Sequence, residues 1–164
     1  MSSDAVDEIV DQWARERPGM PVDSIGVVAR ILRIAKLLTD ERRRVLAELG
    51  IDNAILDLLA TLRRAGSPYR LSPAEIAENC LVSGGAITQR VTRAEESGLV
   101  RSQRSASGKR TVTVELTPRG HEVIERNIEV LIGRERQLLA GMPADDQRRL
   151  EGLLRDLLAQ MSRD

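Results

Sequence analysis

The stretch from Ser72 to Leu116 constrains the fold more than any other part of the chain, because signals for helices and strands follow one another closely in it. Ser72-Pro73-Ala74-Glu75 has the form of a capping box with proline at the first helical position, which predicts a helix as far as Asn79. Ser83-Gly84-Gly85 predicts a tight turn, after which a second helix is expected from Ala86 to Ser97. Two short helices joined by a glycine-containing turn form a helix-turn-helix.

Two strands are expected directly after these helices, at about residues 100–104 and 111–116. Val112, Val114 and Leu116 alternate with polar residues, which is the pattern of a half-buried strand. The residues between the strands would form the tip of a hairpin. The order helix, helix, hairpin predicts a winged helix-turn-helix in which the hairpin is the wing.

Helical periodicity also governs the chain on both sides of this segment. Before it, helices are expected at about residues 4–15, 23–49 and 53–65. After it, one helix should run to about Leu139, and a last helix carries a leucine stripe from Leu150 to Met161. This stripe is more apolar than one small domain needs to cover, so a two-fold partner chain is expected to bury it.

The predicted fold class is therefore mainly α with a two-stranded β wing, a winged helix-turn-helix with N- and C-terminal dimerisation helices. Residues 1–49 would hold an extra N-terminal helix and a long dimerisation helix. Residues 50–118 would form the winged helix-turn-helix, and residues 119–164 the C-terminal dimerisation helices.

The content of cysteine and histidine argues against an enzyme or a metalloprotein. The chain has one cysteine, Cys80, and one histidine, His121. A structural zinc site needs about four ligands, and a Ser-His-Asp mechanism would rest on His121 alone. We expect no cofactor and no metal.

Cys80 has two interpretations, a structural thiol or an oxidation sensor, of which the first is the commoner. His121 is interpreted as a surface or capping residue.

No feature of the sequence indicates a membrane or an export signal. No apolar run approaches the roughly 20 residues that cross a bilayer. The first ten residues carry acidic side chains and no basic one, unlike a secretory signal. We expect a cytoplasmic protein.

Positive charge is concentrated where nucleic acid would be bound. The chain as a whole is neutral, but residues 87–110 hold six basic and two acidic residues, a net charge of +4. A basic face on a neutral protein suits contact with phosphates. The second helix of the motif offers polar side chains to base edges, while Ile87, Val91 and Ala94 should face the core. The predicted DNA-binding residues are Ser83, Gly84, Gly85, Thr88, Gln89, Arg90, Arg93, Lys109 and Arg110.

The chain resembles the MarR family of regulators. The resemblance rests on Leu71–Ala77, Ser83–Thr88, Glu95–Arg101 and Val114–Gly120, and in layout it covers nearly the whole chain. It implies a sequence-specific regulator of transcription, usually a repressor, that binds a pseudo-palindromic operator as a homodimer. Members commonly carry Asp-Xaa-Arg at the wing, whereas Gly108-Lys109-Arg110 has glycine in place of the aspartate.

Trp13, Asp57, Arg64 and Arg90 resemble the effector residues of the urate-responsive branch of this family, which also carries an extra first helix. Urate is a planar monoanion with ring N–H groups. Asp57 can accept an N–H, Arg64 and Arg90 can supply charge and paired donors, and Trp13 can stack on the ring. The expected effector is therefore a small anionic aromatic molecule such as urate.

Three alternatives stay open at this stage. The same residues can bind a different aromatic or carboxylate effector. The protein can be an architectural or activating DNA binder with no effector, in which case these residues are surface ion pairs and phosphate contacts. A small enzyme that uses Asp57, Arg64 and His121 is the third, and the scarcity of nucleophiles opposes it.

Overall fold

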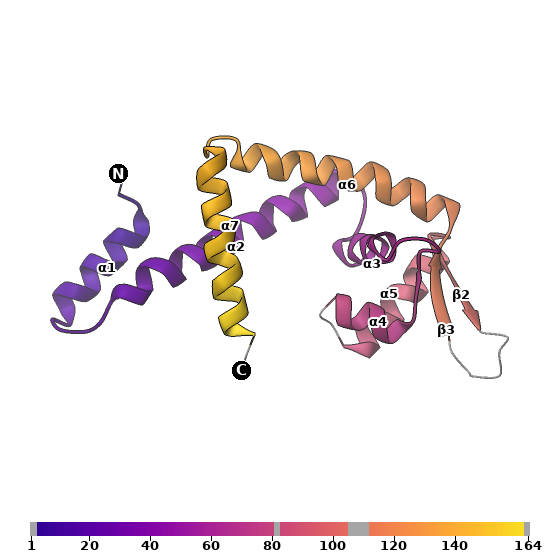
Figure 1. The fold of residues 1–164 in the computed structure, drawn as a ribbon, viewed down its shortest axis with the longest axis horizontal. Helices are drawn as coiled ribbons and strands as arrows, with labels where there is room; N and C mark the ends of the chain where they lie inside the picture. Colours follow the sequence, from indigo (N-terminus) through magenta and orange to yellow (C-terminus); the bar gives the residue numbers. More distant parts are fainter. Residues whose placement is uncertain (1–2, 81–82, 105–111, 163–164) are drawn as a thin grey trace. The chain divides into compact units, whose positions relative to one another are not determined.

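A computed structural model describes residues 3–80, 83–104 and 112–162 of the chain. The chain divides into two compact units, Met1–Gly50 and Ile51–Asp164, which are considered separately. In order along the chain (Figure 1), the elements are α1 (Ala5–Glu16), α2 (Asp23–Glu48), α3 (Asn53–Arg64), β1 (Arg70–Leu71), α4 (Pro73–Asn79), α5 (Gly84–Glu96), β2 (Val100–Arg104), β3 (Val112–Leu116), α6 (Pro118–Leu139) and α7 (Ala144–Met161).

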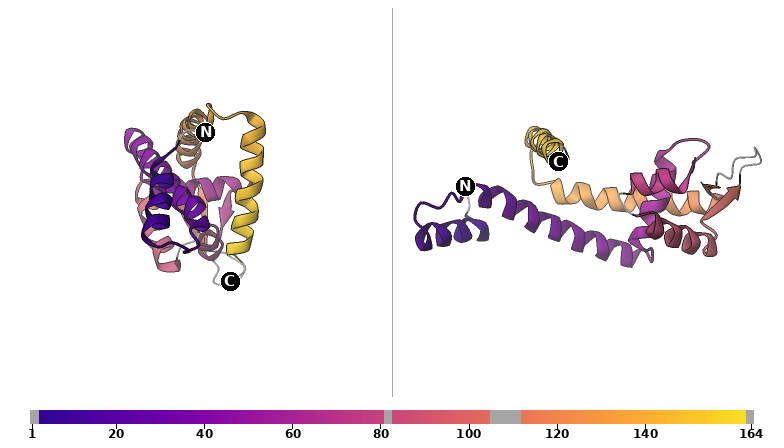
Figure 2. Two further views of the ribbon diagram at one scale, coloured as in Figure 1. Left: turned by 90° about the vertical axis from the view of Figure 1, so that its left-hand side faces the viewer. Right: turned by 90° about the horizontal axis from the view of Figure 1, so that it is seen from below.

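The first unit consists of the two predicted N-terminal helices, and α1 folds back beside the start of α2 (Figure 2). Asp4 caps α1 in a capping box that is completed by Asp7. The guanidinium of Arg30 on α2 donates to Asp4 at 2.8 and 3.0 Å and to Asp7 at 2.7 Å. Val6, which lies between these aspartates in the sequence, is 2% exposed. Polar contacts and one buried valine therefore hold α1 to α2.

The second unit has an aliphatic core centred on α3. Leu56, Leu58, Leu59 and Leu62 are completely buried, because their spacing places them on the inner side of that helix. The other fully buried residues of the core come from α4, α5, β3 and α6. Helices α4 and α5 pack against α3 and against each other, and the strands lie beside them (Figure 1).

Helices α4 and α5 form the predicted helix-turn-helix. The capping box at Ser72 is present: its hydroxyl accepts from the Glu75 N–H, and the Glu75 side chain accepts from the Ser72 N–H. The second helix begins at Gly84, two residues before the predicted start. The reason is that the Ser83 hydroxyl accepts from the Ala86 N–H and so acts as the N-cap. The glycines belong to the first turn of the helix.

The predicted two-stranded wing is present as β2 and β3, and a third strand extends the sheet to the order β1-β3-β2. Strands β2 and β3 pair antiparallel from Val100 opposite Leu116 to Arg104 opposite Val112. The additional strand β1 pairs with β3 through Arg70 and Leu71 only. A strand of two residues is too short to show an alternating pattern, which is why the sequence did not indicate it. The predicted hairpin tip at residues 105–109 lies outside the described residues.

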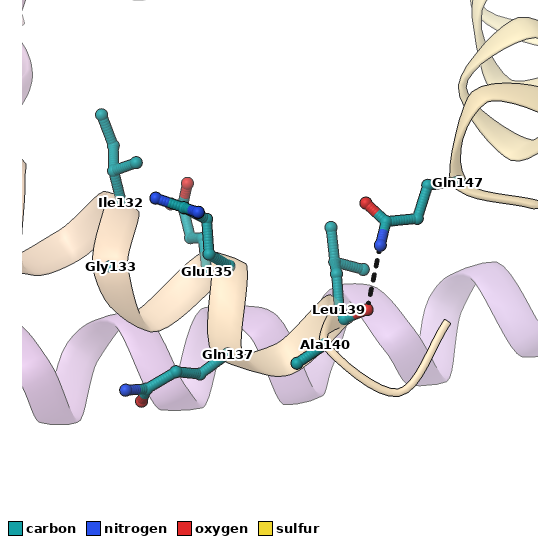
Figure 3. Close-up of a pocket in the computed structure, with 8 residues that line it drawn as sticks. Ile132, Gly133, Glu135, Gln137, Leu139, Ala140 and Gln147 are labelled. Carbon is teal, nitrogen blue, oxygen red and sulfur yellow. Dashed lines mark hydrogen bonds between the residues drawn. The ribbon is translucent and has the colours of Figure 1, made fainter. Parts of the chain in front are cut away.

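Helix α6 begins on the sheet and extends away from it, and α7 starts at its far end and runs across the direction of α6 (Figure 1). Thr117 caps α6 through its hydroxyl, which accepts from the Gly120 N–H at 3.0 Å. At the α6–α7 turn, the Gln147 amide donates to the Leu139 carbonyl (Figure 3). The same amide donates to the Met142 carbonyl. No described residue of α7 is buried. Among the described residues, no helix is long and apolar enough to cross a membrane.

Candidate nucleic-acid interface and its polar cluster

Helix α5 separates a buried face from an exposed polar face, as its sequence predicts. Ile87 and Ala94 are completely buried and Val91 is 8% exposed, so these three side chains anchor the helix in the core. Thr88 and Gln89 are exposed on the opposite side. A helix held in this way offers hydroxyl and amide groups to a partner that approaches from the solvent. Both group types are suited to base edges in the major groove.

The N-terminal turn of α5 is open to close approach. Ser83, Gly84 and Gly85 are all exposed, and a Cβ atom added to either glycine would meet no other atom within 4 Å. Packing inside the described protein therefore does not require glycine at these positions. Glycines at an exposed helix N-terminus leave its N–H groups accessible, which suits a phosphate group.

Two ion pairs connect α5 to α3. Arg90 donates to Asp57 at 3.2 Å, and Arg93 lies 3.6 Å from Asp52, the residue that caps α3. The Arg90 side chain is only 18% exposed, whereas that of Arg93 is 57% exposed. Arg90 is thus turned toward α3, and Arg93 remains accessible at the surface.

The Arg90–Asp57 pair belongs to a larger group that we call the polar cluster: Asp57, Thr61, Arg64, Cys80 and Arg90. Arg64 Nη2 donates to the Thr61 hydroxyl at 3.2 Å, and that hydroxyl lies 3.4 Å from Cys80 Sγ. The first three residues follow one another at spacings of four and three along α3, which places them on one face of the helix. Cys80 comes from the end of α4 and Arg90 from α5, so the cluster joins three helices.

The environment of Cys80 keeps its thiol protonated at neutral pH. Burial raises the pKa of the thiol above its ordinary value of 9.0, and the charge of Asp57 raises it further. The hydrogen bond with Thr61 and the charge of Arg90 act in the opposite direction but are outweighed. Oxidation-sensing cysteines have a lowered pKa, so these surroundings favour the structural interpretation of Cys80.

The structure brings together three of the four predicted effector residues, namely Asp57, Arg64 and Arg90. Trp13 lies on α1 in the other compact unit and is 45% exposed. The predicted wing residues Lys109 and Arg110 lie outside the described residues. Thr61 and Cys80 also belong to the cluster, although the sequence did not place either of them with the effector residues. The spacing from Asp57 to Thr61 to Arg64 could have indicated the threonine, but no local signal connects Cys80 to α3.

His121 packs against an aromatic ring. Its imidazole meets the Tyr69 ring edge-on with centroids 4.5 Å apart, and the Arg63 guanidinium lies 5.1 Å from the centre of the same ring. Arg63 also pairs with Glu125 of α6. Within the described parts of the chain, no three His, Cys, Asp or Glu side chains are grouped as a metal ion would require.

A pocket occurs in the second unit at the far end of α6, next to its turn into α7 (Figure 3). Its lining residues are Ile132, Gly133, Glu135, Arg136, Gln137, Leu139, Ala140 and Gln147. None of them belongs to the polar cluster or to the predicted DNA-binding set. Leu138, beside this pocket in the sequence, is 51% exposed.

The capped helix pair, the exposed polar face of α5 and the sheet at its side define a DNA-binding protein of the winged helix-turn-helix class. Comparison with known proteins gives the family. A model of the MarR family matches residues 49–111. The HTH-type transcriptional regulator PecS of Dickeya dadantii is 31% identical over 149 residues, which cover 91% of this chain and 90% of that protein. The chain belongs to the MarR family, whose members are DNA-binding regulators of transcription and not enzymes.

Two further proteins are similar over most of their length. The HTH-type transcriptional repressor Rv2887 of Mycobacterium tuberculosis is 28% identical over 127 residues, which cover 77% of this chain and 89% of the repressor. The MarR family regulator Sco3205 of Streptomyces coelicolor, solved in complex with DNA, superimposes with a TM-score of 0.74 at 25% identity. That match covers 85% of this chain and 92% of Sco3205.

Proposed function

We propose that this protein is a homodimeric repressor that binds a pseudo-palindromic operator and is released by a small anionic aromatic effector, urate. The observation that carries the proposal is the ion pair between Arg90 of α5 and Asp57 of α3 at 3.2 Å. One side chain of the DNA-binding helix is thereby engaged with a group of polar residues outside that helix. Any ligand that competes for Arg90 acts directly on α5.

The DNA-binding part of the proposal is supported by the polar face of α5. Thr88, Gln89 and Arg93 are exposed there, next to the open N-terminal turn at Gly84 and Gly85. Sco3205, which has a similar fold, binds DNA. Repression is favoured by the similarity to the repressor Rv2887.

The homodimer is supported by apolar side chains left exposed in both units. Helix α7 exposes Leu150, Leu153, Leu154, Leu158 and Met161, each between 39% and 72%. Helix α2 exposes Val27, Val28, Leu32, Ile34, Leu37 and Leu38, each between 48% and 69%. Two chains that bury these helices against each other would present their α5 helices to half-sites about one helical turn apart.

Urate suits the chemistry of the polar cluster. Its negative charge and carbonyls match the guanidinium groups of Arg64 and Arg90, and its N–H groups match the carboxylate of Asp57. Trp13 is proposed to stack on the ring. An anion that binds Arg90 weakens its pair with Asp57 and shifts α5. Coupling between sites of this kind is typically about 1–3 kcal/mol, or roughly 5–150-fold in affinity.

A gel shift with the DNA upstream of the protein's own coding sequence tests the proposal. Salt must be held constant, because phosphate contacts make the affinity steeply salt-dependent. We expect urate to remove the shifted band of the wild type and to have little effect on Asp57→Ala and Arg64→Ala. Arg63→Ala is the matched control, because it removes a neighbouring guanidinium that pairs with Glu125 outside the cluster.

The outcomes separate the alternatives. A band that urate does not change, but that an aromatic carboxylate removes, would assign the cluster to that other effector. A band that none of these ligands changes would contradict an effector of this class and leave a constitutive DNA binder. Absence of any shift with operator-containing DNA would contradict the DNA-binding proposal itself.

A further inference from the structure

We propose that Thr61 and Cys80 form a neutral hydrogen-bond relay that positions Arg64, and that this relay sets how strongly an effector acts on Arg90. The inference rests on the proposed effector site and adds two positioning residues to it. They belong to α3 and to the end of α4, so the relay also connects α4 to the site.

The direction of the first hydrogen bond follows from the donor and acceptor inventory. A guanidinium can only donate, so the Thr61 hydroxyl oxygen accepts from Arg64 Nη2 at 3.2 Å. The same hydroxyl lies 3.4 Å from Cys80 Sγ and forms a hydrogen bond with it. The Asp57 carboxylate, one helical turn before Thr61 on α3, accepts from Arg90 Nη1 at 3.2 Å. The hydrogen bonds of the relay thus run from Arg64 through Thr61 to Cys80, beside the pair of Asp57 and Arg90.

Burial makes this chain costly to break. Thr61 is 3% exposed, and a buried hydroxyl that loses its partners carries the cost of its lost hydration. Its two neighbours, Arg64 and Cys80, come from different helices, so one hydroxyl orients groups on both. Thr61 itself is too deeply buried to be the main contact of a ligand and therefore acts through the residues it holds.

The relay requires a protonated thiol, and the surroundings of Cys80 supply one. Burial and the charge of Asp57 raise the pKa of the thiol. The hydrogen bond from Thr61 stabilises the thiolate and lowers the pKa. Each partner in the relay therefore has a predictable effect on the ionisation of Cys80.

Alkylation of Cys80 by iodoacetamide measures the relay without any effector. The protein has a single cysteine, so mass spectrometry of the full-length chain reports this residue alone. The rate is measured as a function of pH. Thr61→Val should raise the pKa of the thiol and slow alkylation near neutral pH, whereas Thr61→Ser should behave like the wild type. Asp57→Asn should lower the pKa and accelerate alkylation. A Thr61→Val profile equal to that of the wild type would overturn the relay.

The second measurement is the urate response in the gel shift. Each variant is assayed at a protein concentration equal to its own Kd for the DNA. Loss of one hydrogen bond predicts that Thr61→Val needs about fivefold more urate for half-maximal release. Thr61→Ser keeps the hydroxyl and should restore the wild-type response, which excludes a general effect on folding. Equal urate responses of wild type and Thr61→Val would contradict a positioning role.

The two measurements distinguish failure of the relay from failure of the proposed function. If alkylation shifts as expected but urate does not release the wild type, the relay is supported and the urate assignment is wrong. If urate releases the wild type but Thr61→Val alters neither measurement, the proposed function is supported and the relay is wrong.

Discussion

Replacing Gly120 with alanine would place a methyl group on the backbone of Leu99. Gly120 lies in the first turn of α6, and a Cβ atom there would approach the Leu99 carbonyl oxygen far inside the 3.0 Å that real Cβ atoms keep. It would also lie 3.1 Å from the Leu99 carbonyl carbon and 3.2 Å from Leu116 Cδ2. The nearest atoms belong to the backbone, which cannot move aside as a flexible side chain can.

The Leu99 carbonyl is also held in place by hydrogen bonds. It accepts from the Thr117 N–H and from the Thr117 hydroxyl, both at 3.1 Å. Overpacking typically costs about 1–3 kcal/mol, and each weakened hydrogen bond adds about 1 kcal/mol. The better helix propensity of alanine offsets at most about 1 kcal/mol. Gly120→Ala should therefore lower the free energy of unfolding by about 2–4 kcal/mol, which for a chain of this length corresponds to about 5–15 °C in Tm.

Urea and thermal unfolding followed by far-ultraviolet circular dichroism measure this change. The protein concentration must be the same for all variants, because the stability of the proposed dimer would depend on it. Gly85→Ala is the matched control: the same methyl group is added to a helical glycine in the same unit, where no atom lies within 4 Å. If Gly120→Ala were as stable as Gly85→Ala, the packing of α6 on Leu99 would be contradicted.

Three further predictions concern α1 and the helix-turn-helix. Arg30→Ala removes the polar contacts that hold α1 to α2, so the fluorescence anisotropy of Trp13, the only tryptophan, should fall, while Arg33→Ala should leave it unchanged. The hydrogen bond from Arg30 lowers the pKa of Asp4 from 3.8, and the Asp4 backbone N–H together with Arg30 lowers that of Asp7. The contacts with Arg30 should therefore persist above about pH 3.8 and be lost as the pH falls through the lower pKa values of the folded protein. An anisotropy that decreases already between neutral pH and pH 5 would contradict this. Ser72→Ala removes the cap of α4 and should cost about 1 kcal/mol in urea unfolding, and an unchanged midpoint would show that the cap is dispensable.

The sequence by itself determined those features that depend on near neighbours along the chain. The capping box at Ser72, the left-handed Gly50 after α2 and the inward face of α5 all follow from residues within one or two helical turns. The periodicity of a helix is a local property, so the order of residues alone assigns the side of α5 that carries Ile87 to the core. For the same reason, the sequence alone predicts that Asp57 and Arg64 lie on one face of α3.

Only the tertiary structure decided which distant residues meet. Strand β1 exists because residues 70–71 come to lie beside β3, some 40 residues further on. The polar cluster forms because the end of α4 brings Cys80 to Thr61, and because α5 turns Arg90 toward Asp57. Such contacts depend on the packing of whole elements, which is set by the sum of many buried apolar contacts and not by a pattern within any one segment. A side chain such as Arg90 has the same local sequence whether it faces DNA or a carboxylate, and only the position of α3 distinguishes the two.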